Sequence, residues 1–199
     1  MPRRITNYNF SEKKVTAIVG DPEGSYYLII AFAKDGDYCT LRRVSANDLT
    51  QVYSETDVAV DEIKRLMLSG NYFYSVVDND TLFGTRYYKF SLIATTYNFT
   101  KPAGITENAV DVVTDGSFIY YLTPGSASGE VAKLIKYSTY GTYVETIELQ
   151  KSGEEVRNAK SITIDSSGDF WIITNTSPSN LVRVFDDGGW DFTVTELVP

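Results

Sequence analysis

The chain of 199 residues contains no histidine and a single cysteine, Cys39. Without histidine it lacks the side chain that most often acts as a general base near neutral pH and most often binds a transition metal. Histidine-dependent hydrolases, zinc hydrolases and non-haem iron oxygenases are therefore disfavoured. One cysteine excludes a disulfide within the chain, and Cys39 is expected to be a small apolar side chain in a strand.

Long apolar runs are also missing. No run approaches the length of a membrane span, and the opening stretch "MPRRITNYNFSEKK" has two arginines but no apolar segment typical of a signal peptide. The formal charge is −8, and an acidic surface repels phosphate backbones. We therefore expect neither a membrane nor a nucleic acid as a partner, and we expect synthesis in a cytoplasm.

Aromatic residues are abundant, with 15 tyrosines and 10 phenylalanines. Tyrosine, threonine, valine and isoleucine favour strands, whereas the helix-favouring alanine and leucine are comparatively few. The composition therefore predicts an all-β protein.

One pattern occurs four times, as a polar turn with glycine followed by a run of aromatic and β-branched residues. The four copies are "EGSYYLIIA" (23–31), "SGNYFYSVV" (69–77), "DGSFIYYLT" (115–123) and "SSGDFWIIT" (166–174). Their turn glycines, Gly24, Gly70, Gly116 and Gly168, recur every 46 to 52 residues. Glycine is expected here because it adopts the positive φ that a tight turn between strands requires.

A second anchor keeps the same spacing downstream. It consists of "LRRV" (41–44), "YYKF" (87–90), "LIKY" (134–137) and "LVRV" (181–184). In each copy a basic residue, Arg43, Lys89, Lys136 or Arg183, precedes an apolar one, Val44, Phe90, Tyr137 or Val184. Two anchors with one period of about 46 residues are typical of repeat architectures.

Each repeat is interpreted as four short strands. The first strands are expected at 15–19, 63–68, 109–114 and 161–165, and the fourth at 49–54, 95–100, 142–149 and 191–197. The best helical candidate, 60–70, occupies a first-strand position and is therefore interpreted as a strand. Four antiparallel strands with a period in the forties predict a β-propeller blade. We therefore expect one domain, a four-bladed β-propeller with blades at 15–54, 62–100, 109–149 and 160–198.

The stretch "SITIDSSGDFWIITNTSPSNLVRVFDDGGW" (161–190) resembles an NHL-type propeller repeat. The shared pattern is an apolar strand, Asp, a turn glycine, an aromatic strand, and an apolar–basic strand ending in Phe-Asp and Gly. The third unit is similar through 136–149, and the first two units are similar more loosely. The resemblance implies the architecture and no substrate.

An extra strand is expected before the first blade, because "ITNYNFS" (5–11) resembles "ATTYNFT" (94–100). Three outcomes are open for residues 5–10. The strand closes the ring of blades, which we favour, or it replaces the C-terminal segment as the outer strand of the last blade. Alternatively, it pairs with a sheet edge of another subunit.

Several acidic side chains are candidate ligands. Asp35 with Asp37 in the loop expected at 32–40, and Asp78 with Asp80 in the loop expected at 78–85, have a spacing that suits Ca²⁺, but aspartate in such loops is usually a turn residue. Another rim loop brings together Glu154, Glu155 and Arg157 as ligand contacts, although a solvated loop is the simpler interpretation. A lactonase-like metal site would need acids on several inner strands, where only Asp111 and Asp165 stand. We therefore assign no catalytic, cofactor-binding or metal-binding residue.

These features favour a non-catalytic propeller for assembly or recognition, in a phage or viral virion as a tail, spike or capsid-associated protein. Its expected partners are other protein subunits, either further copies of the chain or virion proteins, and a glycan receptor is a further candidate. The alternatives are a carbohydrate-active or lactonase-like propeller enzyme and an intracellular NHL-type adaptor. A cytoplasmic location is the alternative to the virion.

Overall fold

The computed structural model describes residues 14–20, 27–34, 38–45, 52–58, 62–69, 72–78, 86–89, 98–100, 109–126, 129–139, 142–151 and 153–197. Over these ranges the chain forms β-strands and no helix, so the expected all-β class is confirmed. No helix in the described ranges is long and apolar enough to cross a membrane. The proposed extra strand at 5–10 lies outside the described residues.

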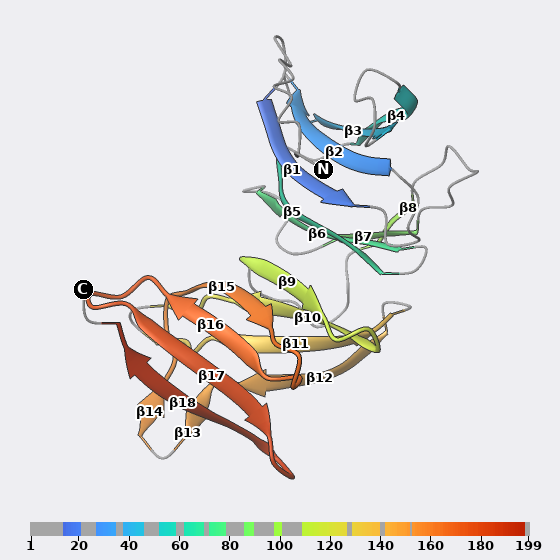
Figure 1. Ribbon diagram of the computed structural model, residues 1–199. Helices are drawn as coiled ribbons and strands as arrows, with labels where there is room; N and C mark the ends of the chain where they lie inside the picture. The colour runs from blue at the N-terminus through green and yellow to red at the C-terminus, as the bar shows by residue number, and fades with distance from the viewer. Residues whose placement is uncertain are drawn as a thin grey trace, which may run out of the picture.

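The strands form four four-stranded sheets, each an antiparallel meander in chain order (Figure 1). The first sheet has β1 (Lys14–Gly20), β2 (Tyr27–Lys34), β3 (Tyr38–Ser45) and β4 (Val52–Val58), and the second has β5 (Glu62–Ser69), β6 (Tyr72–Asp78), β7 (Arg86–Lys89) and β8 (Asn98–Thr100). The third has β9 (Asp111–Thr114), β10 (Phe118–Thr123), β11 (Lys133–Ser138) and β12 (Tyr143–Glu148). The fourth has β15 (Ala159–Ile164), β16 (Phe170–Thr174), β17 (Asn180–Asp186) and β18 (Trp190–Glu196), and a short hairpin of β13 (Gln150–Lys151) and β14 (Glu154–Glu155) precedes it.

The expected order of strands is confirmed, including a strand rather than a helix at Glu62–Ser69. Two boundaries were wrong. The fourth strand of the first unit was expected at 49–54, whereas β4 runs to Val58, because β3 is long and Cys39 still pairs with Val58. The loop expected at 32–40 is mostly strand, because β2 and β3 stay paired as far as Lys34 and Tyr38.

The turn glycines of the third and fourth sheets adopt the expected conformation. Gly116 has a φ of 91° and Gly168 a φ of 92°. Both precede the aromatic strand of their sheet, β10 or β16. A residue with a Cβ is strained at such a φ, which explains why glycine recurs at this position.

Both faces of the third sheet are buried. On one face, Ile119 and Tyr121 pack in an apolar cluster with Val76 of β6. On the other face, Tyr120 and Leu122 pack in a larger cluster that includes the buried side chains of the fourth sheet. Because successive side chains of a strand point to opposite faces, the aromatic run of β10 supplies apolar contacts to both neighbouring sheets.

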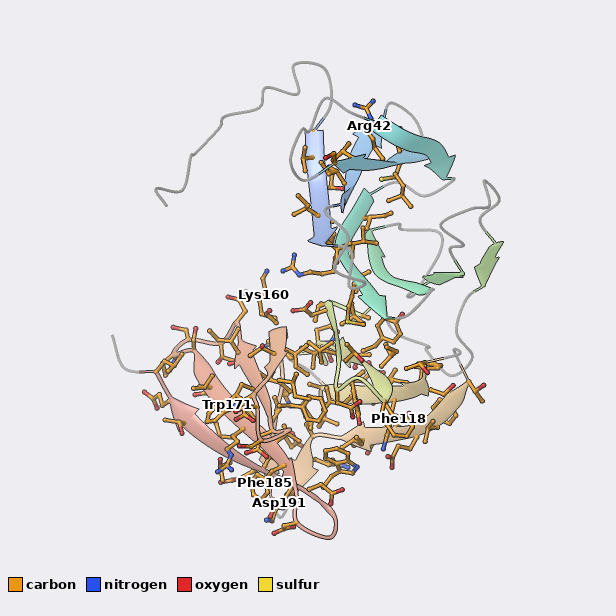
Figure 2. The ribbon with its side chains drawn as sticks, turned by 45° about the vertical axis from the view of Figure 1, so that its right-hand side comes forward. Arg42, Phe118, Lys160, Trp171, Phe185 and Asp191 are labelled. Carbon is orange, nitrogen blue, oxygen red and sulfur yellow. The ribbon has the colours of Figure 1, made fainter. Side chains whose placement is uncertain are left out.

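The first strands of the four sheets follow one another through the molecule. β1 packs beside β5, β5 beside β9, and β9 beside β15. In both views β1 lies apart from β15, with β5 and β9 between them (Figures 1 and 2). The described residues therefore form a succession of stacked antiparallel sheets without a closed ring, and the closed four-bladed ring stays a prediction.

The turn geometry predicts that glycine is required at two positions and dispensable at a third. Gly116→Ala and Gly168→Ala should each lower the free energy of unfolding by about 1–2 kcal/mol, the cost of a left-handed backbone for an L-residue. Gly129→Ala is the control, because its φ is not positive and an added Cβ meets nothing within 4 Å. Urea denaturation measures all three, and equal losses would contradict the assigned role of the turns.

Candidate functional site

Asp111, at the start of β9, joins three of the inner strands. The carboxylate is buried, with 6% of the residue exposed. Its Oδ2 accepts hydrogen bonds from Ser161 Oγ at 2.6 Å and from the Ile162 amide at 3.0 Å, both on β15. Its Oδ1 accepts the Val112 amide at 3.0 Å and lies 3.3 Å from Nε of Arg65 on β5. Asp111 therefore acts as a tie between neighbouring sheets.

The lactonase-like hypothesis required Asp111 and Asp165 to act as axial ligands. The structure engages both oxygens of Asp111 with protein donors, whereas Asp165 lies in the turn after β15. Over the described ranges, no group of three or more His, Cys, Asp or Glu side chains is arranged to hold a metal ion.

Two aspartates organise the turns that precede the aromatic strands. Asp115 Oδ1 accepts the amides of Ser117 and Phe118, and its Oδ2 accepts the Tyr120 hydroxyl at 2.9 Å. Burial, followed by this bond to Asp115, raises the pKa of Tyr120. These contacts fix the aromatic side chain relative to its turn.

Asp165 plays the same part in the fourth sheet. Its Oδ1 accepts the amides of Ser167 and Asp169, and its Oδ2 accepts the indole N–H of Trp171 at 2.8 Å. The indole N–H, followed by the two amides, holds the pKa of Asp165 below its usual value. Both oxygens of this carboxylate thus have protein donors, and its role is to fix the turn.

The recurring basic residue lies directly across from an aromatic one in the third and fourth sheets. Lys136 pairs in register with Tyr120, and its Nζ lies 4.4 Å from the ring centre of Phe118. Such cation–π contacts strengthen as the site is desolvated. Lys136 Nζ is also 3.0 Å from Glu145 Oε1.

Arg183 repeats this arrangement. It pairs in register with Trp171, its Cζ lies 5.2 Å from the ring centre of Phe185, and its Nε donates to Asp169 Oδ2 at 2.7 Å. The sequence revealed the basic position but not this role. The signal for it was the opposition of the basic and aromatic positions in adjacent strands.

These matching pairs show which residues are equivalent in the third and fourth sheets. Since Tyr120 with Lys136 corresponds to Trp171 with Arg183, Leu122 corresponds to Ile173. Leu122 is fully buried because the fourth sheet covers it, whereas Ile173 is 39% exposed. We call the uncovered surface the fourth-sheet end face, formed by Trp171, Ile173, Leu181, Arg183 and Phe185. Figure 2 shows Trp171 and Phe185 on the side of the fourth sheet away from the third.

The opposite end of the stack shows the same contrast. In the first sheet Ile29 pairs with Arg43, so Ile18 corresponds by register to Ile162 of the fourth sheet, and Val15 corresponds to Ala159. Ile162 and Ala159 are 6% and 3% exposed, whereas Ile18 and Val15 are 56% and 41% exposed. We call the surface with Val15, Ile18, Ile30, Arg42 and Val44 the first-sheet end face. Ile30 and Val44 are buried, so its exposed part is at β1.

The remaining candidate residues do not form a binding site together. Arg157 bonds Glu155 and also donates through Nη1 to the backbone oxygens of Ser126 and Glu130 at 2.9 and 3.2 Å. It therefore clamps two surface segments, while Glu154 is exposed on β14. Cys39 is buried in β3, as expected.

The proposed calcium pairs cannot be placed in full. Asp35, Asp37 and Asp80 lie outside the described residues. Asp78 is the last residue of β6, where it pairs with Glu62.

The fold is similar to several solved structures. The extracellular domain of a protein described as a hybrid two-component system from B. thetaiotaomicron matches with a TM-score of 0.64 and 12% identity, over 98% of this chain and 24% of that one. A functionally unknown protein from Desulfotomaculum acetoxidans DSM 771 matches with 0.58 and 10%, over 92% and 55%, and the computationally designed Ika8 protein with 0.52 and 10%, over 85% and 46%.

The chain thus spans between about a quarter and about half of the length of these structures, and the similarity establishes the fold alone. No protein-family model matches the chain, and no curated protein matches it in sequence.

The contacts of Asp111 predict a strong coupling between two sheets. Asp111→Ala leaves the buried Ile162 amide without its acceptor, at about 1–3 kcal/mol, and the partly buried Ser161 Oγ as well, at a smaller cost. In a double-mutant cycle with Ser161→Ala, measured by urea denaturation, the coupling energy should be about 0.5–3 kcal/mol. Asp187→Ala, in an exposed turn, is the control. Additive effects of the two substitutions would contradict the proposed tie.

The lowered pKa of Asp165 predicts a titration of Trp171 in acid. Because the folded pKa is depressed, the bond to the indole persists above the unfolded value of 3.8 and is lost as the pH falls through the folded pKa. The indole N–H signal of Trp171, assigned with Trp171→Phe and followed by NMR, should therefore shift only below pH 3.8. It should not titrate in Asp165→Asn. A midpoint at or above 3.8 would count against the proposed bond.

Proposed function

We propose that the four sheets are β-propeller blades in an open arc, and that the chain is a non-catalytic assembly module that binds a protein partner through its end faces. The observation that carries this proposal is the contrast between equivalent positions. Leu122 is fully buried inside the stack and Ile173 is 39% exposed at its end.

Three features support the propeller interpretation. Each sheet has four antiparallel strands in chain order. The first strands pack side by side in succession, and equivalent register positions of two neighbouring first strands, Asp111 and Ser161, hydrogen-bond directly. Blades of a propeller surround a common axis in this way. Two of the similar proteins are longer than this chain, and about half of each of those proteins lies outside the region that matches.

The chemistry of the fourth-sheet end face supports a protein partner. Trp171 and Arg183 are of residue types that are enriched in binding hot spots, and Phe185 is of a type that is enriched in interfaces. Burying an aliphatic or aromatic side chain such as Ile173 is worth about 1.5–3 kcal/mol. A glycan receptor remains a second kind of partner in this proposal, because exposed aromatic and hydroxyl side chains also suit polar recognition.

The virion location belongs to this proposal on sequence grounds. It rests on the absence of histidine and on strands rich in tyrosine, threonine and asparagine. The enzymatic alternative has less support, because both oxygens of Asp111, the buried acid that it needs, already have protein donors.

Site-specific photocrosslinking in the producing cell tests the proposed function. A photoreactive amino acid replaces Ile173, and in a control it replaces Val144, which is 44% exposed on β12 and lies outside both end faces. We expect a discrete protein adduct at 173 and none at 144, and its mass tells a second copy of the chain from another protein. Equal or absent adducts at the two positions would refute a binding role of the end face.

A further inference from the structure

We propose that the fourth-sheet end face binds the first-sheet end face of a second copy of this chain, so that two copies close one ring of eight sheets. The inference rests on the proposed function and names the partner for the same surface. It follows from an interface that the molecule already contains, between its third and fourth sheets.

That internal interface is the template. The third sheet contributes Tyr120, Leu122 and Leu134, and the fourth contributes Ile162, Ile172 and Val184, all in one buried cluster. Tyr120 and Phe170 meet there edge to face, with ring centres 4.6 Å apart. This interface shows which apolar side chains each of two packed sheets contributes to a contact of this kind.

The two end faces carry residues equivalent to those on the two sides of this internal interface. By strand register, Trp171, Ile173 and Leu181 take the places of Tyr120, Leu122 and Leu134 on the outer side of the fourth sheet. On the first sheet, the exposed Val15 and Ile18 of β1 take the places of Ala159 and Ile162, whereas Ile30 and Val44 are already buried within the chain. The exposed side chains of β1 are apolar, like the residues whose places they take, so β1 of one copy complements the fourth-sheet end face of another.

The polar groups of the fourth-sheet end face suit an apolar partner. The indole N–H of Trp171 is bonded to Asp165, and Arg183 is paired with Asp169. Both groups would therefore keep a hydrogen-bond partner when this face is covered. The usual cost of burying polar atoms, the loss of such partners, is thus avoided.

The charged residue of the opposite face also has a suitable environment. Arg42, half-buried on the first-sheet end face, takes the place of Val182. In the proposed contact it faces the side of the fourth sheet that carries Trp171, Phe185 and Asp169. Aromatic rings and an acid are favourable neighbours for a guanidinium group.

Geometry excludes contact between the two end faces of one chain in this structure. β1 and β15 lie apart in both views, separated by β5 and β9 (Figures 1 and 2). Contact of unlike faces on two molecules generates a closed ring when the rotation permits it. Propellers have about four to eight blades. Since each chain supplies four sheets, two copies give eight and more copies exceed this range.

Sedimentation velocity of the purified chain tests the proposal. The wild type should sediment as two copies at micromolar concentration. Ile173→Asp and Ile18→Asp should each weaken self-association by at least about 100-fold, because every contact in the ring then buries a charge. Val144→Asp, at an exposed position outside both faces, should leave the mass unchanged. Circular dichroism confirms that each variant is folded.

Mixing the variants tests the head-to-tail arrangement. An equimolar mixture of Ile173→Asp and Ile18→Asp contains one intact pair of faces and should regain two-copy association, more weakly than the wild type because a single contact lacks the gain of closing the ring. No recovery on mixing, or an unchanged mass for Ile18→Asp alone, would overturn the head-to-tail contact.

If the wild type stays a single copy at every concentration, the proposal that a second copy binds the end face is overturned. If position 173 still crosslinks another protein in the cell, the proposed function survives that result. If it does not, both proposals fail.

Discussion

The structure depends on the burial of apolar side chains between successive antiparallel sheets. A four-stranded sheet of this composition has two apolar faces and cannot bury both by itself. The third sheet shows the solution, because β10 places Ile119 and Tyr121 against the second sheet and Tyr120 and Leu122 against the fourth. The tie made by Asp111 adds a polar link at the inner strands. Stacking therefore gives each sheet its stability, and it leaves exposed apolar side chains at the two ends of the stack, Val15 and Ile18 on the first sheet and Ile173 on the fourth.

This constraint links the fold to the proposed function. Inside the stack, equivalent positions are buried by the next sheet. At the ends of the stack, Ile18 corresponds by register to the buried Ile162, and Ile173 corresponds to the buried Leu122, but no neighbouring sheet in the described part of the chain covers either isoleucine. The exposed apolar side chains of the end faces thus follow from the repeat itself, and burying them against a partner is favourable.

Much of the fold was predictable from the sequence because its signals are local and repeated. The turn glycines require a positive φ, which Gly116 and Gly168 show, and the aromatic run of β10 alternates between two buried faces. The boundary of β4 was missed because strand length depends on pairing with β3, which the local sequence of β4 does not encode. The end faces were missed for a related reason: Ile173 looks like Leu122 in sequence, and only the arrangement of sheets determines which is covered.

The central claim is that the sheets are blades whose end faces join in a ring. Cryo-electron microscopy of the purified protein tests it most directly, because the sheets around the axis can be counted and the fourth sheet located. The account predicts a ring of eight sheets in which the fourth sheet of one copy packs on the first sheet of another. Isolated particles with Ile173 facing solvent, or a closed ring of four sheets from one chain, would contradict it.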